Sequence, residues 1–285
     1  MTEPVASIVV RTKDEAASIG RLLDLLDGQR VDGPVDTIVV DSGSRDGTPA
    51  IARGRVDRLI EIPAHSFTFG RALNLGAAAA SAPVIVALSA HAFPLDEGWL
   101  ARLIACFADE RVACAGGAVS GPDHAPVSGP IVQDLALART NPFWGYSNAA
   151  GGFRADLWRQ RPFLEDLPGT EDKEWAWHWL SRGKLVVLDP ALVVDHDHSR
   201  DPPLDCYRRA KREWQGYAAY LDLEPLTARD AARKWWTEQG VHRSLWRARR
   251  DPWRAARLVG QWAGRRRGRA QSRVSRADSS PEPSR

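Results

Sequence analysis

The first 120 residues alternate between short apolar runs rich in β-branched residues and segments in which apolar residues recur at helical spacing. The apolar runs predict buried strands at 7–10, 35–41, 56–62, 84–88 and 112–119. The segments between them predict helices at about 16–26, from Thr48 onward, at 70–80 and at about 96–107. Strands that alternate with helices in this way predict an α/β fold with a parallel, Rossmann-like central sheet.

The run at 84–88 is the central strand of this prediction. It ends in the small polar cluster Ser89-Ala90-His91, and Pro94 then prevents the strand from continuing. Ligands of open α/β sheets bind outside the carboxyl ends of the strands. His91 is therefore a candidate ligand-binding residue, although a histidine at a strand end can equally be structural.

Composition places the chain among ordinary globular proteins, with 44% hydrophobic and 26% charged residues and a net charge of +3 over 285 residues. That length suits one large domain with an appendage. The three cysteines have neither metal-binding nor disulfide spacing, which predicts a cytoplasmic protein. No signal peptide is expected at the N-terminus. The uncharged stretch 72–95 is divided by Pro83, so we expect helix, turn and strand there rather than a membrane span.

The second half predicts less regular structure. Residues 121–148 are irregular, and the small residues at 148–153 suit close approach by a ligand or by backbone. A helix is expected from Thr170 to about Arg182, short strands at 184–188 and 191–194, and a helix at 202–221. The predicted organisation is a domain over 1–200, with halves at about 1–120 and 121–200, a basic, tryptophan-rich helical extension over 201–264, and a disordered tail over 265–285.

The first strand is not followed by Gly-x-Gly-x-x-Gly, which argues against a dinucleotide fold. Instead, the second strand ends in Val39-Val40-Asp41-Ser42-Gly43-Ser44-Arg45-Asp46-Gly47-Thr48, and the first is followed by the loop Arg11-Thr12-Lys13-Asp14-Glu15. Together these segments resemble the nucleotide-binding half of the inverting family 2 glycosyltransferases, over roughly 5–198. The resemblance implies a GT-A-type fold and transfer of a sugar from a nucleotide-diphosphate sugar to a hydroxyl acceptor.

The same resemblance implies which residues bind the nucleotide. A carboxylate at the position of Asp41 hydrogen-bonds the base or ribose in that family, and the segment from His65 to Gly76 resembles its rhamnosyltransferase-like members. The candidate nucleotide-binding residues are Thr12, Asp14, Asp41, Ser42, Arg71 and Ser89. Two alternatives remain open: Ser44, Asp46 and Thr48 can simply cap a helix, and Arg71 can be a surface residue.

The family's Asp-x-Asp signature is replaced here by Ser89-Ala90-His91, so that His91 takes the place of the last metal-binding aspartate. Imidazole suits Mn²⁺ better than Mg²⁺, and the expected cofactor is a divalent cation, Mn²⁺ in preference to Mg²⁺. Related enzymes carry a further histidine after a late strand, and alternation along His196-Asp197-His198 makes His196 the second candidate metal ligand. Direct contact of His91 with phosphate and a surface histidine pair are the alternatives.

Glu171 and Asp172 resemble the family's Glu-Asp pair, and they are the candidate catalytic residues. Inverting transfer requires a base that accepts the proton of the attacking hydroxyl, and Asp172 matches the position of that base. The alternative is that both acids merely stabilise the first turn of a helix through its dipole.

The arginines and tryptophans between 246 and 262 suit the surface of an anionic membrane, and an acceptor such as a lipid-linked glycan at the inner face of the cell membrane would fit them. Helices that pack through their tryptophans explain the same composition. The predicted function is a glycosyltransferase of cell-envelope glycan or glycolipid assembly. An inactive nucleotide-sugar-binding protein is the second hypothesis. A nucleic-acid-binding protein is the third, and no nucleic-acid partner is expected.

Overall fold

The computed structural model describes residues 3–197, 201–223, 227, 229–230, 233 and 252–278, with side chains in the last range described as far as Arg266. The chain forms two compact units. The first comprises Met1–Asp166 and Glu171–His196, and the second comprises Leu167–Thr170 and Asp197–Arg285. The first unit thus ends close to the domain boundary predicted at residue 200.

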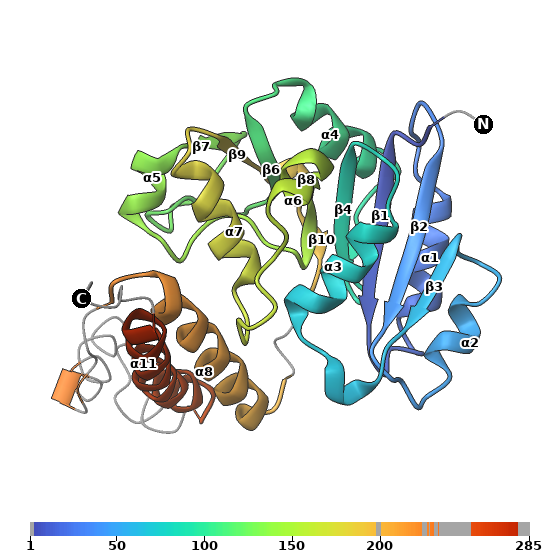
Figure 1. Cartoon of the computed structure of the whole chain (residues 1–285). Helices are drawn as coiled ribbons and strands as arrows, with labels where there is room; N and C mark the ends of the chain where they lie inside the picture. The colour runs from blue at the N-terminus through green and yellow to red at the C-terminus, as the bar shows by residue number, and fades with distance from the viewer. Residues whose placement is uncertain are drawn as a thin grey trace, which may run out of the picture. The chain divides into compact units, whose positions relative to one another are not determined.

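The first unit contains all ten strands of the described chain (Figure 1). These are β1 (Ala6–Thr12), β2 (Val35–Asp41), β3 (Arg58–Glu61), β4 (Val84–Ser89), β5 (Phe93–Pro94), β6 (Val112–Gly117), β7 (Ile131–Gln133), β8 (Ala150–Arg154), β9 (Leu185–Asp189) and β10 (Val194–Asp195). Its helices are α1 (Ile19–Asp27), α2 (Thr48–Ala52), α3 (Phe69–Ala79), α4 (Trp99–Ala105), α5 (Leu135–Thr140), α6 (Ala155–Gln160) and α7 (Glu171–Leu180), with short 3₁₀ turns at Ala64–Ser66, Cys106–Ala108 and Pro190–Leu192.

The main sheet has eight strands in the order β3-β2-β1-β4-β8-β6-β9-β7. Strands β3, β2, β1 and β4 are mutually parallel, as predicted, but β8 lies antiparallel between β4 and β6. Because β8 is antiparallel to both of its neighbours, β6 runs in the same direction as β4, and the parallel arrangement predicted for the first 120 residues holds. The whole sheet is mixed, since β8 and β7 run against the other strands. A separate two-stranded sheet pairs β10 with β5.

Strand β8 consists largely of the small residues that the sequence marked for close approach. A Cβ on Gly151 would lie 2.7 Å from the carbonyl oxygen of Ala115 in β6 and 2.7 Å from the ring of Tyr146. A Cβ on Gly152 would lie 3.1 Å from the ring of Phe107. Glycine is required because neighbouring strands and rings fill the space that a side chain would occupy.

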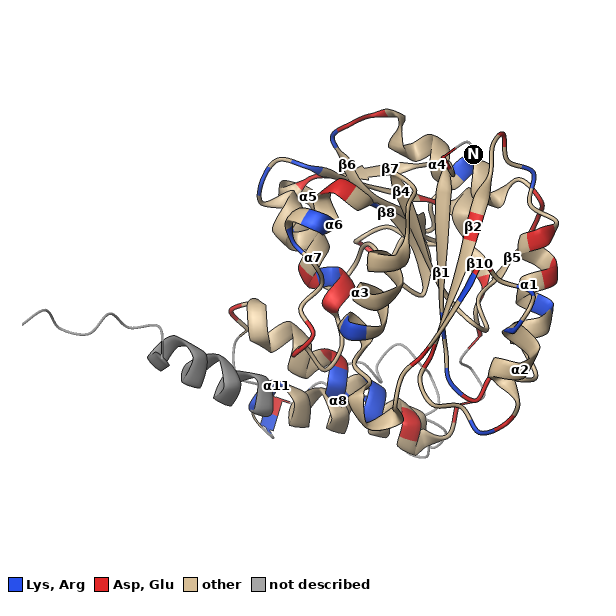
Figure 2. Cartoon of the chain, turned by 45° about the vertical axis from the view of Figure 1, so that its right-hand side comes forward, with Lys and Arg blue, Asp and Glu red and all other residues tan. Residues whose placement is uncertain are grey.

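Strand alternation divides the core between the two faces of the sheet. Ile8 and Val10 of β1 face the side covered by α1 and α4, whereas Val9 faces the side that contains α3, α6 and α7. Figure 1 shows these helices on the sheet's two sides. Figure 2 shows that acidic and basic residues lie mostly on helices and loops, as expected for strands that are buried on both faces.

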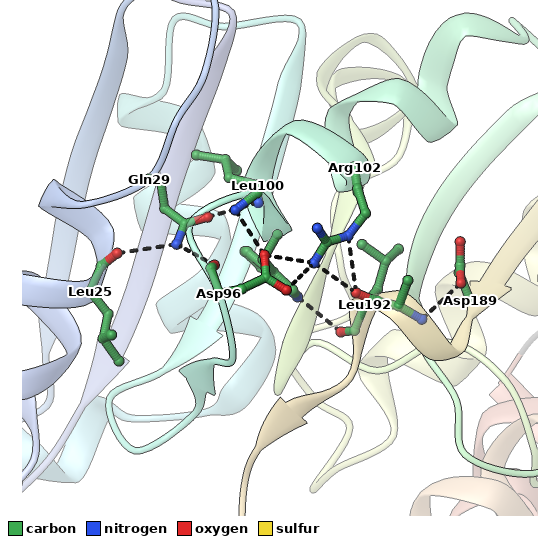
Figure 3. A network of polar contacts seen from close by, with 10 residues as sticks. Leu25, Gln29, Asp96, Leu100, Arg102, Asp189 and Leu192 are labelled. Atoms are coloured by element: carbon green, nitrogen blue, oxygen red, sulfur yellow. Dashed lines mark hydrogen bonds and ion pairs between the residues drawn. The ribbon is translucent and has the colours of Figure 1, made fainter.

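A polar network joins the end of α1 to the segments that precede α4 and β10 (Figure 3). The Gln29 side chain donates to the carbonyl oxygens of Leu25 and Asp96 and accepts from the backbone nitrogen of Leu100. Arg102 pairs with the Asp96 carboxylate at 2.7 Å and donates to the carbonyl oxygen of Ala191. These contacts attach the turn at Pro190–Leu192, and so the chain leading to His196, to the nucleotide-binding half of the predicted domain.

The second unit contains α8 (Pro203–Tyr220) and α11 (Pro252–Asp278). The two helices pack closely at glycines: a Cβ on Gly260 would lie 2.6 Å from the carbonyl oxygen of Tyr207 and 2.9 Å from Cβ of Ala210. Helix α11 continues past Arg265, where the sequence predicted a disordered tail to begin. No helix of the described residues is long and apolar enough to cross a membrane.

Candidate active site

The parallel strands bring the predicted site residues to one edge of the sheet. The strand register places Thr12 of β1 beside Asp41 of β2, and Arg11 beside Ser89 of β4. All four residues lie at the carboxyl ends of their strands, where α/β sheets bind their ligands. Backbone pairing therefore brings three of the nucleotide-binding candidates, Thr12, Asp41 and Ser89, to the same edge.

Asp41 is buried, with 1% of its surface exposed, and its carboxylate organises the loop that follows β2. Oδ1 accepts from the backbone nitrogens of Gly43 at 3.0 Å and Ser44 at 2.9 Å, and Oδ2 accepts from the Ser44 hydroxyl at 2.5 Å. The Asp41 carboxylate therefore fixes the shape of this loop.

Asp14 joins the loop after β1 to the loop after β2. Its backbone nitrogen donates to Oγ of Ser44 at 2.8 Å, and its Oδ1 accepts from the backbone nitrogen of Arg45 at 2.8 Å. Asp46 and Thr48 add the same kind of link, because they accept from the backbone nitrogens of Ala16 and Glu15, each at 2.8 Å. Helix capping alone therefore does not describe Ser44, Asp46 and Thr48: they attach one loop to the other.

The other nucleotide-binding candidates differ in how accessible they are. The hydroxyls of Thr12 and Ser42 are buried and have no hydrogen-bond partner among the described residues. Arg71 is exposed and lies 3.8 Å from Glu165, which fits a surface residue. Ser89 is half-buried, and its backbone nitrogen donates to the carbonyl oxygen of Ala149.

His91 and His196, the two candidate metal ligands, lie together. Their rings stack with centroids 4.8 Å apart and planes inclined by 19°. Nδ1 of His91 lies 2.6 Å from Oε1 of Glu15, a residue that the sequence analysis did not single out. Burial by itself raises the pKa of Glu15, but hydrogen bonds from His91 and Ser18 outweigh it and hold this pKa below its usual range. His198 lies outside the described residues.

These residues fit a cation that is held mainly by its substrate. Among the described residues, no three histidine, cysteine or acidic side chains are grouped to hold a metal ion. An imidazole whose Nδ1 is bound to a carboxylate, as in His91, is a common metal-ligand arrangement. Cations in phosphoryl sites often take one or two protein ligands and complete their shell with phosphate oxygens and water. His91 and the adjacent His196 could supply one or two ligands of such a cation, but they do not form a site built from protein ligands alone.

The predicted catalytic pair begins α7. The Glu171 side chain is buried and lies 3.6 Å from Nη1 of Arg11. Asp172 is partly exposed, and its Oδ2 accepts from the backbone nitrogen of Asn148 at 3.0 Å. Arg11 also donates to the carbonyl oxygen of Asn148 at 3.0 Å. The start of α7, the end of β1 and the segment before β8 thus converge on Asn148 and Arg11.

The electrostatics of the two acids differ. Burial, followed by the neighbouring charge of Asp172, raises the pKa of Glu171 to about 7, against the opposing effect of Arg11. Because Glu171 is enclosed and paired, it is poorly placed to exchange a proton with a ligand. Asp172 is the more accessible of the two carboxylates.

A pocket of about 440 Å³ lies next to one of the two histidines and to the residue that follows the acidic pair. Its wall includes His196, whose ring stacks on His91, and Lys173, which follows Asp172. The remaining lining residues are Gly117, Ala118, Val119, Ser120, Phe143, Trp144, Gly145, Ser147, Ala149, Ala150, Leu192, Val193 and Val194. Mostly apolar walls with a few polar groups are typical of small-molecule sites.

Arg11, Glu15 and Asn148 also lie at this site, although the sequence did not predict them as site residues. Arg11 and Glu15 lie in the loop segment that carried the family resemblance, and their charge at a strand end was the available signal. Asn148 offered only its position in a stretch of small residues. Its side chain accepts from the Tyr146 hydroxyl at 2.8 Å, which helps to fix the backbone nitrogen that binds Asp172.

Comparison with known proteins identifies a family for the chain and solved structures with a similar fold. The model of the family described as Glycosyl transferase family 2 matches residues 7–155. No curated protein matches the chain in sequence. Among solved structures, the chain is similar to the mannosyltransferase PcManGT from Pyrobaculum calidifontis in complex with GDP-Man and Mn²⁺, with a TM-score of 0.65, 19% identity and coverage of 96% of this chain and 88% of that one.

Two other similar structures are of bacterial proteins. S. aureus TarS 1-349 in complex with UDP-GlcNAc has a TM-score of 0.52 and 15% identity, with 96% of this chain and 92% of that chain covered. Glucosyl-3-phosphoglycerate synthase from Mycobacterium tuberculosis, in complex with Mn²⁺, UDP and glucosyl-3-phosphoglycerate, has a TM-score of 0.54 and 20% identity, with 75% of this chain and 78% of that chain covered. At these identities the likeness shows the fold, which is the GT-A type expected from the sequence.

Proposed function

The protein belongs to glycosyl transferase family 2, since that family's model matches more than half of the chain, and from this we propose that it transfers a sugar from a nucleotide-diphosphate donor to a hydroxyl acceptor with inversion at the anomeric carbon. The observation that carries the proposal is the pocket lined by His196, whose ring stacks on His91, and by Lys173, the residue that follows Asp172. A single cavity next to a phosphate- or cation-binding group and a carboxylate base is what a one-step displacement requires.

In this proposal the pocket receives the acceptor. The acceptor oxygen attacks the anomeric carbon on the side opposite the diphosphate, the new carbon–oxygen bond forms as the old one breaks, and the bonding electrons leave with the diphosphate. Asp172 takes the proton of the attacking hydroxyl. Since the Glu171 carboxyl is 4% exposed, we assign it a supporting role in which, with Arg11, it holds the first turn of α7.

On the donor side, Asp41 and Asp14 hold the loops after β2 and β1 in the shape that receives the nucleotide. In this proposal the backbone groups of these two loops contact the nucleotide. The hydroxyls of Thr12 and Ser42 are buried and therefore less suited to that contact. A divalent cation, when bound, would be held by His91 and His196 and would neutralise negative charge on the diphosphate. The imidazole ligands favour Mn²⁺ over Mg²⁺.

We further propose that the acceptor is a lipid-linked glycan at the inner face of the cell membrane, used during cell-envelope assembly. The support is the basic and tryptophan-bearing composition of the second unit, where Arg208, Arg209, Lys211 and Arg212 follow one another on α8 and Trp253 of α11 is 42% exposed. Co-sedimentation with phosphatidylglycerol vesicles in rising salt tests this form. Equal binding to neutral and anionic vesicles, or to none, would refute it.

The main proposal is tested by calorimetry with UDP and GDP and by a hydrolysis screen of nucleotide sugars with Mn²⁺, with Mg²⁺ and with chelator. We expect one nucleoside diphosphate to bind and its sugar conjugate to be hydrolysed slowly in the absence of acceptor. Binding without hydrolysis or transfer would favour the inactive nucleotide-sugar-binding protein. Absence of binding to every nucleotide tested would overturn both.

A further inference from the structure

The imidazole of His91 is held both at one edge and on one face. At the edge, its Nδ1 lies 2.6 Å from Oε1 of Glu15, and on the face the ring of His196 stacks at 4.8 Å. A ring held from two directions has little freedom to change either of its side-chain torsions. His91 is therefore fixed before any ligand arrives.

Glu15 is itself anchored through its backbone and its second carboxylate oxygen. Its backbone nitrogen donates to Oγ1 of the fully buried Thr48 at 2.8 Å. Its Oε2 accepts from the Ser18 hydroxyl at 2.5 Å. Three chain segments, those after β1, after β2 and after β4, therefore meet at this one residue.

A carboxylate only accepts hydrogen bonds, so its contact with Nδ1 places the ring proton on that nitrogen. Coordination is then directed to Nε2, and the carboxylate makes that nitrogen a stronger donor to a metal ion. We propose that Glu15 is a positioning residue that orients His91 and enhances its affinity for the cation of the nucleotide-diphosphate complex. This inference rests on the proposed function.

Glu15 could instead act only as a structural residue at the start of α1, where its carbonyl oxygen accepts from the backbone nitrogens of Ser18 and Ile19. That role uses the backbone and does not depend on the charge of the side chain. The two roles predict different behaviour when the carboxylate is replaced: a structural role leaves cation binding unchanged, whereas a positioning role weakens it.

The test compares the wild-type chain with Glu15→Gln, Glu15→Ala and His91→Ala, and with Glu97→Gln as a matched control. Glu97 is an exposed glutamate that pairs with Arg30. Mn²⁺ binding is titrated by electron paramagnetic resonance in the presence of saturating UDP or GDP, whichever binds. Pulsed measurements on the same samples detect ¹⁴N coupling from a histidine ligand, and thermal unfolding reports whether each variant is folded.

We expect wild type and Glu97→Gln to bind Mn²⁺ equally and to show the ¹⁴N coupling, which His91→Ala should weaken or abolish. Glu15→Ala should lower Mn²⁺ affinity about 10- to 100-fold, the range typical of partners that support metal ligands, and Glu15→Gln should lower it less. If Glu15→Ala does not fold, the smaller loss in Glu15→Gln decides the matter.

Wild-type affinity in every folded Glu15 variant would overturn the inference, as would ¹⁴N coupling that His91→Ala leaves unchanged. A wild-type protein that binds nucleotide but not Mn²⁺ would also overturn it while leaving the transferase proposal standing. Failure of the wild type to bind any nucleotide would instead overturn the proposed function itself.

Discussion

Replacement of Glu171 by glutamine should change how the stability of the first unit depends on pH. Burial and the charge of Asp172 raise the pKa of Glu171 to about 7 from an ordinary value of 4.5. Between these two values the folded protein holds a proton that the unfolded chain has released. The free energy of unfolding must therefore fall as pH rises through this window, and the loss is complete above about pH 7.

The size of the effect follows from the width of the window. A shift from 4.5 to about 7, at about 1.4 kcal/mol per pH unit, corresponds to about 3 kcal/mol of stability that wild type loses between low and neutral pH. Glutamine cannot ionise, so the variant should lose none of it. Arg11 keeps its bond to the carbonyl oxygen of Asn148 and its place over the Phe69 ring, which limits the cost of removing its charged partner.

The measurement is urea unfolding of wild type, Glu171→Gln and the exposed control Glu97→Gln at pH values from 4.5 to 8.5, followed by tryptophan fluorescence. The difference in unfolding free energy between Glu171→Gln and wild type should become more favourable to the variant by about 3 kcal/mol across this range. Glu97→Gln should track wild type. A difference that stays constant with pH, or that moves against the variant as pH rises, would refute the assignment of a raised pKa to a buried Glu171.

Three further variants test other parts of the structure. Asp172→Asn removes the proposed base and should lower turnover at least about 10²-fold while donor affinity, measured by calorimetry, stays near wild type; near-normal turnover with the true acceptor would contradict the mechanism. Asp41→Asn should lower stability by about 1–2 kcal/mol in urea unfolding and weaken nucleotide binding, because the loop at Gly43 and Ser44 loses a charged acceptor, and an unchanged unfolding midpoint would contradict this. Gly260→Ala should disrupt the packing of α8 on α11, at a cost of about 1–3 kcal/mol, whereas Gly20→Ala in α1, with its nearest neighbour at 3.8 Å, should be neutral or stabilising; equal melting temperatures for the two would argue against the close packing.

The expected behaviour of Asp41→Asn shows where inference from the sequence alone is insufficient. Its position at a strand end predicts an acid that is available to hydrogen-bond a ligand. In the structure, three hydrogen bonds from Gly43 and Ser44 satisfy it within its own loop. The sequence identifies the strand end, but the direction of the carboxylate depends on how the next residues turn back, and Gly43, at φ +78°, adopts a conformation that apolar patterning does not encode.

Whether a strand could be predicted depended on the side chains that it carries. The strand predicted at 35–41 matches β2, because a run of β-branched residues between turns is a strong signal. Strand β8 was missed as a strand because Ala150, Gly151 and Gly152 carry no such signal, and only the surrounding sheet explains them. The first half of the strand predicted at 191–194 is a 3₁₀ turn, since Asp189 accepts from the backbone nitrogen of Ala191 and Pro190 starts the turn, and the strand β10 begins only at Val194.

The candidate site residues likewise differ in whether the local sequence carries a signal for them. Asp172 and His91 could be predicted as candidate site residues because each lies in a local motif that resembles the family. Glu15 and His91 are 76 residues apart in the chain and meet only because β1 pairs with β4 in a particular register. His91 stands where the family signature carries an aspartate, and Glu15, which follows a different strand, places a carboxylate next to its imidazole. The folded site thus contains a carboxylate that the segment Ser89-Ala90-His91 lacks. The pairing of β1 with β4, rather than the local motif, brings this carboxylate to His91.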